Sequence, residues 1–306
     1  MIDLKYHIAS LVAVFLALAV GILIGTSLIR SQSVESQIDH LRDRFDRIQA
    51  EDRQLRADNS ELQQQIRTLE NALQLVVPAA VRARLTGKRI AVIVSEPRPD
   101  TSLLRDLKHL LNGAGASVAS ITTLRGNLIP ENAASRQAIL AHAGIEGQEL
   151  ERARRQLAGR IVQGVVQGKE PEFLRLAAQY SPGLVLDGDY TLPVDGVLLL
   201  AATSTEETEA LTHGNGVLAR VASVLAEQEV PVVVCERQAV TASLVPRFAR
   251  YNLTTVDSVD TPLGKIALVY ALAGKQGHFG TKPDSAQLLP ELDLEPLSPE
   301  PTPPAR

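Results

Sequence analysis

The chain begins with a continuous apolar segment. Residues 8–29 contain no charged side chain and only Ser10, Thr26 and Ser27 as polar interruptions. A helix of this length, at about 1.5 Å per residue, crosses the roughly 30 Å hydrocarbon core of a bilayer. A secretory signal has a shorter apolar core of about 7–15 residues, and no small-residue cleavage site follows this segment. We therefore predict an uncleaved transmembrane helix over residues 8–29, after a flank of residues 1–7.

Small residues recur along one face of this predicted helix. Ala13, Ala17, Gly21 and Gly25 are spaced four residues apart, and the last two form a G-x-x-x-G pair. Such a pair lets two helix backbones approach closely in a membrane. Small residues are also common in transmembrane helices generally, so the pattern has two interpretations, a dimerisation face or ordinary composition.

Basic residues are more numerous after the apolar segment than before it. Lys5 precedes the segment, whereas Arg30, Arg42, Arg44 and Arg47 follow it. By the positive-inside rule this distribution favours a cytoplasmic C-terminal side. Long domains are often translocated in spite of such a bias, so the charges alone leave the orientation open.

A seven-residue repeat follows the apolar segment. Ten of the twelve first and fourth positions in six consecutive heptads are apolar, and Asp52 is one of the two exceptions. The other seam residues are Ile38, Leu41, Phe45, Ile48, Leu55, Asn59, Leu62, Ile66, Leu69, Leu73 and Val76. A sustained 3.5-residue period is typical of a coiled coil rather than of one amphipathic helix on a globular domain. We therefore predict a long parallel coiled-coil helix over residues 31–77 that pairs two copies of the chain.

Two polar seam positions bear on how the copies pair. Asn59 occupies a first heptad position, where its amide can pair with its own copy and favour two parallel strands in fixed register. Asp52 at another such position lowers local stability, and we interpret it as a tolerated flaw. Parallel pairing also agrees with a membrane anchor, because two helices that leave one membrane face run in the same direction. Pro78 is expected to end the helix.

Short apolar runs alternate with helical patterns over residues 88–280. The runs predict strands at Arg89–Ser95, Ser117–Thr122, Gly196–Ala201, Val230–Cys235 and Asn252–Val256. Helices are expected from the cap Asp100 to Gly113, over Gln148–Val166 and Pro171–Tyr180, and after Thr261. Continuous apolar strands separated by helices indicate a mostly parallel sheet covered on both faces. We predict an α/β domain of the doubly wound, Rossmann-like or flavodoxin-like type, with no strand order assigned.

The end of the chain is predicted to form a loop followed by a disordered tail. Residues 277–290 carry Gly, Pro and Asp at short intervals and are expected to form a loop. Residues 290–306 are too rich in Pro and polar residues to pack, and we predict a disordered tail there.

Charge and motifs exclude several kinds of chemistry. The net charge of −4 offers no electrostatic footprint for nucleic acid. The sequence contains no G-x-G-x-x-G, P-loop, G-x-S-x-G or H-E-x-x-H motif, so we expect neither a cofactor nor catalytic residues, and no enzyme. The pair Asp187 and Asp189 is interpreted as a turn rather than a cation site, and Gly214-Asn215-Gly216 as a loop rather than an anion cradle. Cys235, the single cysteine, is expected to be an inert buried thiol.

Three stretches carry a resemblance to a known family. Residues 1–29, residues 256–274 (VDSVDTPLGKIALVYALAG) and residues 277–283 (GHFGTKP) are similar to the MctB-like copper transporter family of Gram-positive bacteria and actinobacteria. The resemblance implies a single-pass cell-membrane protein with its soluble part outside the cytoplasm and a role in copper transport or homeostasis. It also implies an alternative, a non-enzymatic envelope scaffold in cell division or in the regulation of peptidoglycan hydrolases.

The residues of the chain provide little support for a copper-binding site. Copper sites use thiolates, thioethers or clustered imidazoles, whereas this chain has one Cys, only Met1 and six dispersed histidines, namely His7, His40, His109, His142, His213 and His278. The metal ligands therefore stay unknown, and copper is expected only through the resemblance. The expected partners are the lipid bilayer, a second copy of the chain, and a membrane or envelope protein.

Overall fold

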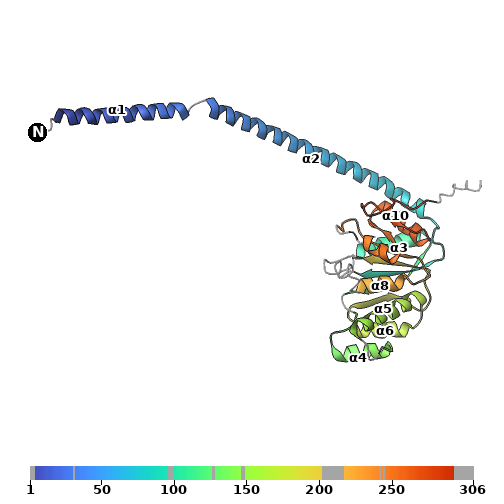
Figure 1. Cartoon of the computed structure of the whole chain (residues 1–306). Coiled ribbons are helices and arrows are strands. Elements are labelled where there is room, and N and C mark those ends of the chain that lie inside the picture. Colours follow the sequence, from blue (N-terminus) through green and yellow to red (C-terminus); the bar gives the residue numbers. More distant parts are fainter. Residues whose placement is uncertain are drawn as a thin grey trace, which may run out of the picture. The chain divides into compact units, whose positions relative to one another are not determined.

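The computed structural model of the chain describes residues 4–29, 32–95, 100–125, 128–145, 149–201, 217–240, 243 and 245–292. The chain falls into two units, Met1–Thr68 and Leu69–Arg306. The first unit is helical, and the second contains an α/β fold (Figure 1).

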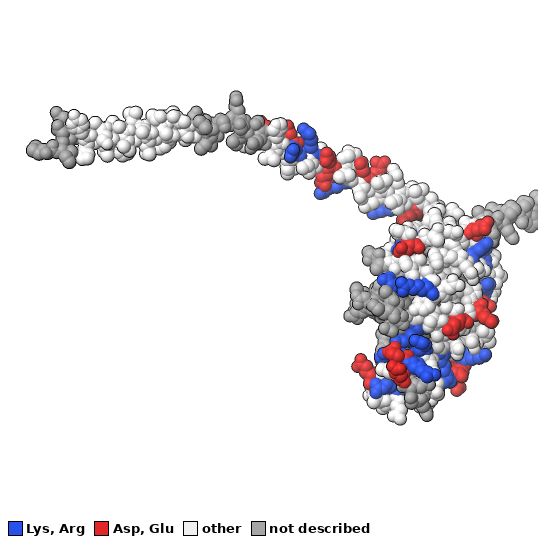
Figure 2. All heavy atoms as spheres, viewed as in Figure 1, with Lys and Arg blue, Asp and Glu red and all other residues white. Residues whose placement is uncertain are grey.

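Helix α1, Leu4–Ile29, forms the predicted apolar segment. Among the described residues it is the one helix long and apolar enough to cross a membrane, over Tyr6–Thr26. Its described side chains are exposed throughout this range, and Figure 2 shows neither acidic nor basic residues along it. The N-terminal apolar helix is thus confirmed, and its length and composition suit a bilayer.

Helix α2, Gln32–Val81, covers the heptad repeat and continues past Pro78. The expectation that Pro78 ends the helix was wrong. A proline lacks the N–H that would bond to the carbonyl four residues earlier, which weakens a helix at that point. Val77, Ala80 and Val81 are nevertheless buried in the core of the second unit. We attribute the extra turn to this burial, which outweighs the missing hydrogen bond.

Seven strands form one sheet in the second unit, in the order β3-β2-β1-β4-β5-β6-β7. Their bounds are β1 Arg89–Ser95, β2 Ser117–Leu124, β3 Leu184–Gly188, β4 Gly196–Ala201, β5 Val232–Cys235, β6 Thr254–Val256 and β7 His278–Phe279. All neighbours pair in parallel except β2 and β3, which are antiparallel. The mostly parallel sheet is confirmed, and β3 and β7 are strands that the sequence pattern did not predict.

Helices cover both faces of this sheet (Figure 1). Helices α3, Thr101–Gly113, and α10, Pro262–Leu272, cover one face together with the end of α2. The other face is covered by α4 Ala133–His142, α5 Leu150–Gln167, α6 Pro171–Tyr180, α8 Val217–Leu225, and the short α9 Val245–Phe248 with the 3-10 helix η1 Ala249–Tyr251. Asp100 caps α3 as predicted and accepts from the Ser102 and Leu103 N–H groups. Thr261, where a helix was expected to begin, caps α10 and accepts from the Gly264 N–H.

The sheet has a hydrophobic core on each face, because successive side chains of a strand point to opposite faces. Along β1, Ile90, Val92 and Val94 join the core beneath α3 and α10, whereas Ala91 and Ile93 join the core beneath α5 and α8. Because successive side chains of a strand point to opposite faces, a strand buried on both sides must be apolar at every position. The continuous apolar runs of the sequence therefore mark the central strands.

The last described residues belong to this fold. Phe279 forms a bridge with Gln287, and Leu289 and Leu292 pack against the core beneath α10. The loop predicted over residues 277–290 therefore contains the short strand β7. Residues 293–306 lie outside the described residues, and the disordered tail stays a prediction.

Candidate functional site

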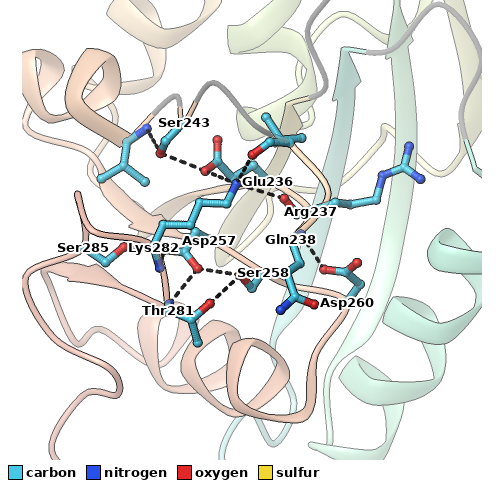
Figure 3. Close-up of polar contacts among 12 residues, drawn as sticks. Glu236, Arg237, Gln238, Ser243, Asp257, Ser258, Asp260, Thr281, Lys282 and Ser285 are labelled. Atoms are coloured by element: carbon cyan, nitrogen blue, oxygen red, sulfur yellow. Dashed lines mark hydrogen bonds and ion pairs between the residues drawn. The ribbon is translucent and has the colours of Figure 1, made fainter. Parts of the chain in front are cut away.

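Polar side chains gather where three neighbouring strands end (Figure 3). Glu236 directly follows β5, Asp257 and Ser258 follow β6, and Thr281 and Lys282 come shortly after β7. The carboxyl ends of parallel strands lie at one edge of a sheet, where α/β folds bind ligands. We call the following set the carboxyl-edge cluster: Glu236, Arg237, Ser243, Asp257, Ser258, Thr281, Lys282 and Ser285.

A buried ion pair forms one half of the cluster. Lys282 Nζ donates to Glu236 Oε1 over 2.8 Å and to the carbonyls of Arg237 and Val240 over 3.0 and 2.7 Å. Ser243 Oγ donates to the same Glu236 oxygen over 2.9 Å. The Lys282 and Glu236 side chains are only 13% and 3% exposed. An ammonium group has three donors, and all three are used within the protein.

A carboxylate with four donors forms the other half. Asp257 Oδ1 accepts from Ser258 Oγ at 2.7 Å and from the Thr281 N–H at 2.8 Å. Asp257 Oδ2 accepts from the Lys282 N–H at 3.0 Å and from the Ser285 hydroxyl. Burial raises the pKa of this carboxyl, but the hydrogen bonds from Ser285, Ser258 and the two backbone amides outweigh burial and lower its net pKa. Asp257 is therefore held as a carboxylate.

Glycine is required where the chain passes this carboxylate. A Cβ atom at Gly280 would lie 2.0 Å from Asp257 Cγ, and the φ angle of Gly280 is +147°. Ser258 also has a left-handed backbone, with φ of 55°, and its hydroxyl lies 2.9 Å from Thr281 Oγ1. The backbone after β7 can therefore approach the end of β6 closely enough to donate two amides.

The cluster works as a clamp between two sequence segments. It joins residues 256–274 to residues 277–283, the two closing stretches that carry the family resemblance. The Ser258 residue is only 1% exposed, and its hydroxyl contacts Asp257 and Thr281. Since its charges are paired internally, this geometry supports positioning of the chain rather than catalysis.

Asp100 caps the helix that follows β1, where doubly wound folds often bind a phosphate. Strand β1 lies between β2 and β4, so the chain reverses its direction across the sheet there, and α3 follows β1. Asp100 Oδ1 accepts from the Ser102 and Leu103 N–H groups at the start of α3, over 2.9 and 3.3 Å. The hydrogen bonds from Ser102 and Leu103 lower the pKa of Asp100, and Arg237 lies 3.1 Å from its other oxygen. Among the described residues, the start of α3 is therefore capped by a carboxylate of the protein itself.

The described part of the chain does not assemble a metal site. No group of three or more His, Cys, Asp or Glu residues able to hold an ion occurs among the described residues. Cys235 is fully buried in β5, and burial, followed by the charge of Glu236, raises the pKa of its thiol well above the ordinary value. Asp189 pairs with Arg89 at 3.1 Å and accepts from Thr191, as a turn residue does. These donors do not resemble the soft or imidazole-rich set that copper prefers.

The residues predicted to pair two copies are mostly exposed in the single chain. The apolar seam residues Leu41, Phe45, Ile48, Leu55, Leu62 and Ile66 are between 55% and 68% exposed. Asn59 Oδ1 accepts from Gln63 Nε2 over 2.8 Å. Ala13, Ala17, Gly21 and Gly25 are also exposed. Residues 213–216, with His213 and the Gly214-Asn215-Gly216 loop, lie outside the described residues.

Sequence reasoning missed the carboxyl-edge cluster. Its ion-paired members Glu236 and Lys282 are 46 residues apart, so no short motif contains the cluster. A weak signal existed, because Glu236 and Asp257 each directly follow a run that the sequence predicts as a strand. Polar residues at such positions share one edge of a parallel sheet, which is the rule that could have found them.

Comparisons with known proteins give one consistent result. The family "Copper transport outer membrane protein, MctB" matches residues 1–290. The chain is 25% identical over 323 aligned positions to "Copper transporter MctB" of Mycobacterium bovis, covering 92% of this chain and 96% of that protein. The identity and coverage are the same for the protein of that name from Mycobacterium tuberculosis. The match of the family over nearly the whole length shows that this chain belongs to the MctB family.

Proposed function

We propose that this chain is a single-pass membrane protein that serves copper transport or homeostasis as a parallel dimer. Membership of the MctB family supports the connection with copper. The apolar helix α1 supports a membrane anchor over residues 8–29. In this proposal residues 31–77 form the dimeric stalk, residues 88–280 form an α/β head outside the cytoplasm, and residues 290–306 form a disordered tail.

The observation that carries the dimer is the exposed apolar seam of α2. Each Leu or Ile side chain stabilises a protein by about 1.5–3 kcal/mol when it is fully buried. The first unit leaves the row from Leu41 to Ile66 more than half exposed on a helix that is otherwise polar. A second copy in parallel register would bury that row and bring the two Asn59 amides together.

The head acts by presentation rather than by copper ligation in this proposal. Helix α1 has no ionisable group between residues 8 and 29, and ion pathways through membranes are built from polar or ionisable groups. The described head offers paired charges and a buried thiol rather than open copper ligands. Copper would therefore be handled by a membrane or envelope partner that the dimeric stalk holds in place.

The test replaces two seam leucines in the full-length protein. Leu55→Glu together with Leu62→Glu should convert the detergent-solubilised dimer to a monomer in sedimentation analysis and abolish copper tolerance in cells. Leu75→Glu is the matched control, because Leu75 is 83% exposed and lies outside the seam positions. A seam variant that stays dimeric would overturn the dimeric stalk.

A copper titration separates the two roles of the head. Competition with a copper(I) chelator should show no stoichiometric binding by the full-length wild-type protein. Tight binding that is lost in Cys235→Ser would replace presentation by direct copper handling. If cells carrying the seam variant kept normal copper tolerance but divided abnormally, the alternative of an envelope scaffold in cell division or peptidoglycan hydrolase control would be favoured.

A further inference from the structure

A groove separates α5 from α8 on the side of the sheet opposite α10. The two helices are tied by Arg220 and Glu151, whose side chains lie 2.5 Å apart. The groove has a volume of about 460 Å³ and extends to the connection between α5 and α6. We call it the α5–α8 groove, and its wall on α5 carries Arg155, Gln156, Gly159, Gln163 and Gln167, with Lys169 following the helix.

The floor of the groove is open because position 159 has no side chain. A Cβ atom at Gly159 would lie 3.6 Å from Val224 Cγ2, which is an ordinary contact. Alanine would therefore fit, and a glycine inside a helix costs about 1 kcal/mol relative to alanine. Neither backbone strain nor crowding requires glycine here. Its effect is to leave room between the helices.

Three glutamine amides form one side of the groove. Gln156, Gln163 and Gln167 are seven and four residues apart, so they share one face of α5. All three are exposed, and the structure records no hydrogen bond of their amides to any residue that it describes. A glutamine amide both donates and accepts, as a peptide backbone does. The glutamines are about 10.5 and 6 Å apart along the helix axis, so the row can pair with peptide groups that are two to three residues apart in an extended chain.

Cations stand at the two ends of this row. Arg155 and Lys169 are exposed and, within the described part of the chain, have no carboxylate partner. Arg160 between them is already engaged by Glu170 at 2.9 Å and the His142 carbonyl at 3.1 Å. The α8 side of the groove also carries the exposed Glu227, so the lining holds three cations and two carboxylates and has a net charge of +1, on a protein whose net charge is −4.

We propose that the α5–α8 groove binds an extended acidic peptide segment of a partner protein. Positions 155 and 167 are about 18 Å apart along the helix axis, which an extended peptide of about five or six residues spans. Carboxylates of the peptide pair with Arg155 and Lys169, and its backbone pairs with the glutamine row. Among the described residues no aromatic side chain lines the groove, so they provide no surface for stacking on a sugar or a nucleobase. The inference concerns one head and does not depend on the dimeric stalk.

Fluorescence anisotropy with the full-length protein in detergent provides the test. The probe is a short fluorescein-labelled peptide of alternating glutamate and alanine, and the comparison probe has lysine in place of glutamate. The acidic probe should bind at least tenfold more tightly than the basic probe and lose affinity as salt is raised. Absence of binding, or equal binding of both probes, would overturn the proposal.

Three variants locate the site. Arg155→Glu with Lys169→Glu should weaken binding of the acidic probe at least tenfold, and Gly159→Leu should do the same by filling the floor. Arg152→Glu is the matched control, because Arg152 is exposed on α5 and does not line the groove, and it should change binding less than threefold. Circular dichroism and thermal unfolding verify that the variants fold. If Gly159→Leu folds and binds the acidic probe with unchanged affinity, the groove is not the binding site.

Discussion

Lys282 Nζ lies 2.8 Å from Glu236 Oε1, although the two residues are 46 positions apart in the chain. The pair fastens the segment after β7 to the end of β5. Two opposite charges buried together attract each other, so removing either one leaves the other less well compensated in a low-dielectric site. This relationship makes the cluster sensitive to single changes.

Lys282→Met is expected to destabilise the protein by more than about 1.5 kcal/mol, since the hydrogen bonds of the buried ammonium to Glu236 and to two carbonyls are lost. Urea unfolding followed by circular dichroism measures the change. The double variant Lys282→Met with Glu236→Gln should recover part of the lost stability, because the charge of Glu236 that Lys282 compensates is removed as well. If Lys282→Met were as stable as wild type, the ion pair would not be what fastens the segment after β7 to the end of β5.

Gly280→Ala is expected to reduce the free energy of unfolding by more than about 3 kcal/mol. The added Cβ would collide with the Asp257 carboxylate at 2.0 Å, and φ of +147° is unfavourable for alanine. Gly113→Ala is the matched control at the end of α3, where a Cβ would meet nothing within 4 Å. The control should leave the melting temperature unchanged or slightly raised.

The stability contributed by Asp257 should depend on pH in the acid range. Its pKa in the folded protein is lowered, because four hydrogen bonds outweigh the effect of burial. This contribution is therefore complete above the unfolded-state pKa of about 3.9 and is lost as pH falls through the lower folded-state pKa.

Asp257→Asn should consequently be much less stable than wild type at neutral pH. The difference in free energy of unfolding between the two proteins should become smaller below about pH 4. Urea titrations at neutral and acid pH measure both differences. Asp284→Asn, at an exposed position nearby, serves as the control and should show no such convergence. If the stability difference between Asp257→Asn and wild type does not change with pH, the four hydrogen-bond donors do not hold Asp257 as a carboxylate.

The thiol of Cys235 should be unreactive in the folded protein. It is fully buried, and burial raises its pKa well above the ordinary value, so little thiolate forms at neutral pH. A chromogenic disulfide reagent should modify Cys235 at least a hundredfold more slowly in the native protein than in guanidinium chloride. Rapid native modification would show that the strand end opens to solvent.

Local signals in the sequence determined much of the fold. The uncharged run over residues 8–29 predicted α1, and the residue runs of β1 and β4 predicted two central strands with the bounds that the structure has. Asp100 and Thr261 marked the starts of α3 and α10. Such signals act between residues within one or two turns or along one strand, so they can be read without knowing the rest of the structure.

Tertiary structure alone decided the features that depend on distant neighbours. Strand β7 has two residues, too few for any period, and exists because it pairs with β6. Helix α2 passes Pro78 because its last turn is buried in the head. Gly280 is needed only because Asp257 lies against it. Contacts between residues far apart in the chain leave no periodic pattern in the sequence, so the clamp became visible only when the strand ends were brought to one edge of the sheet.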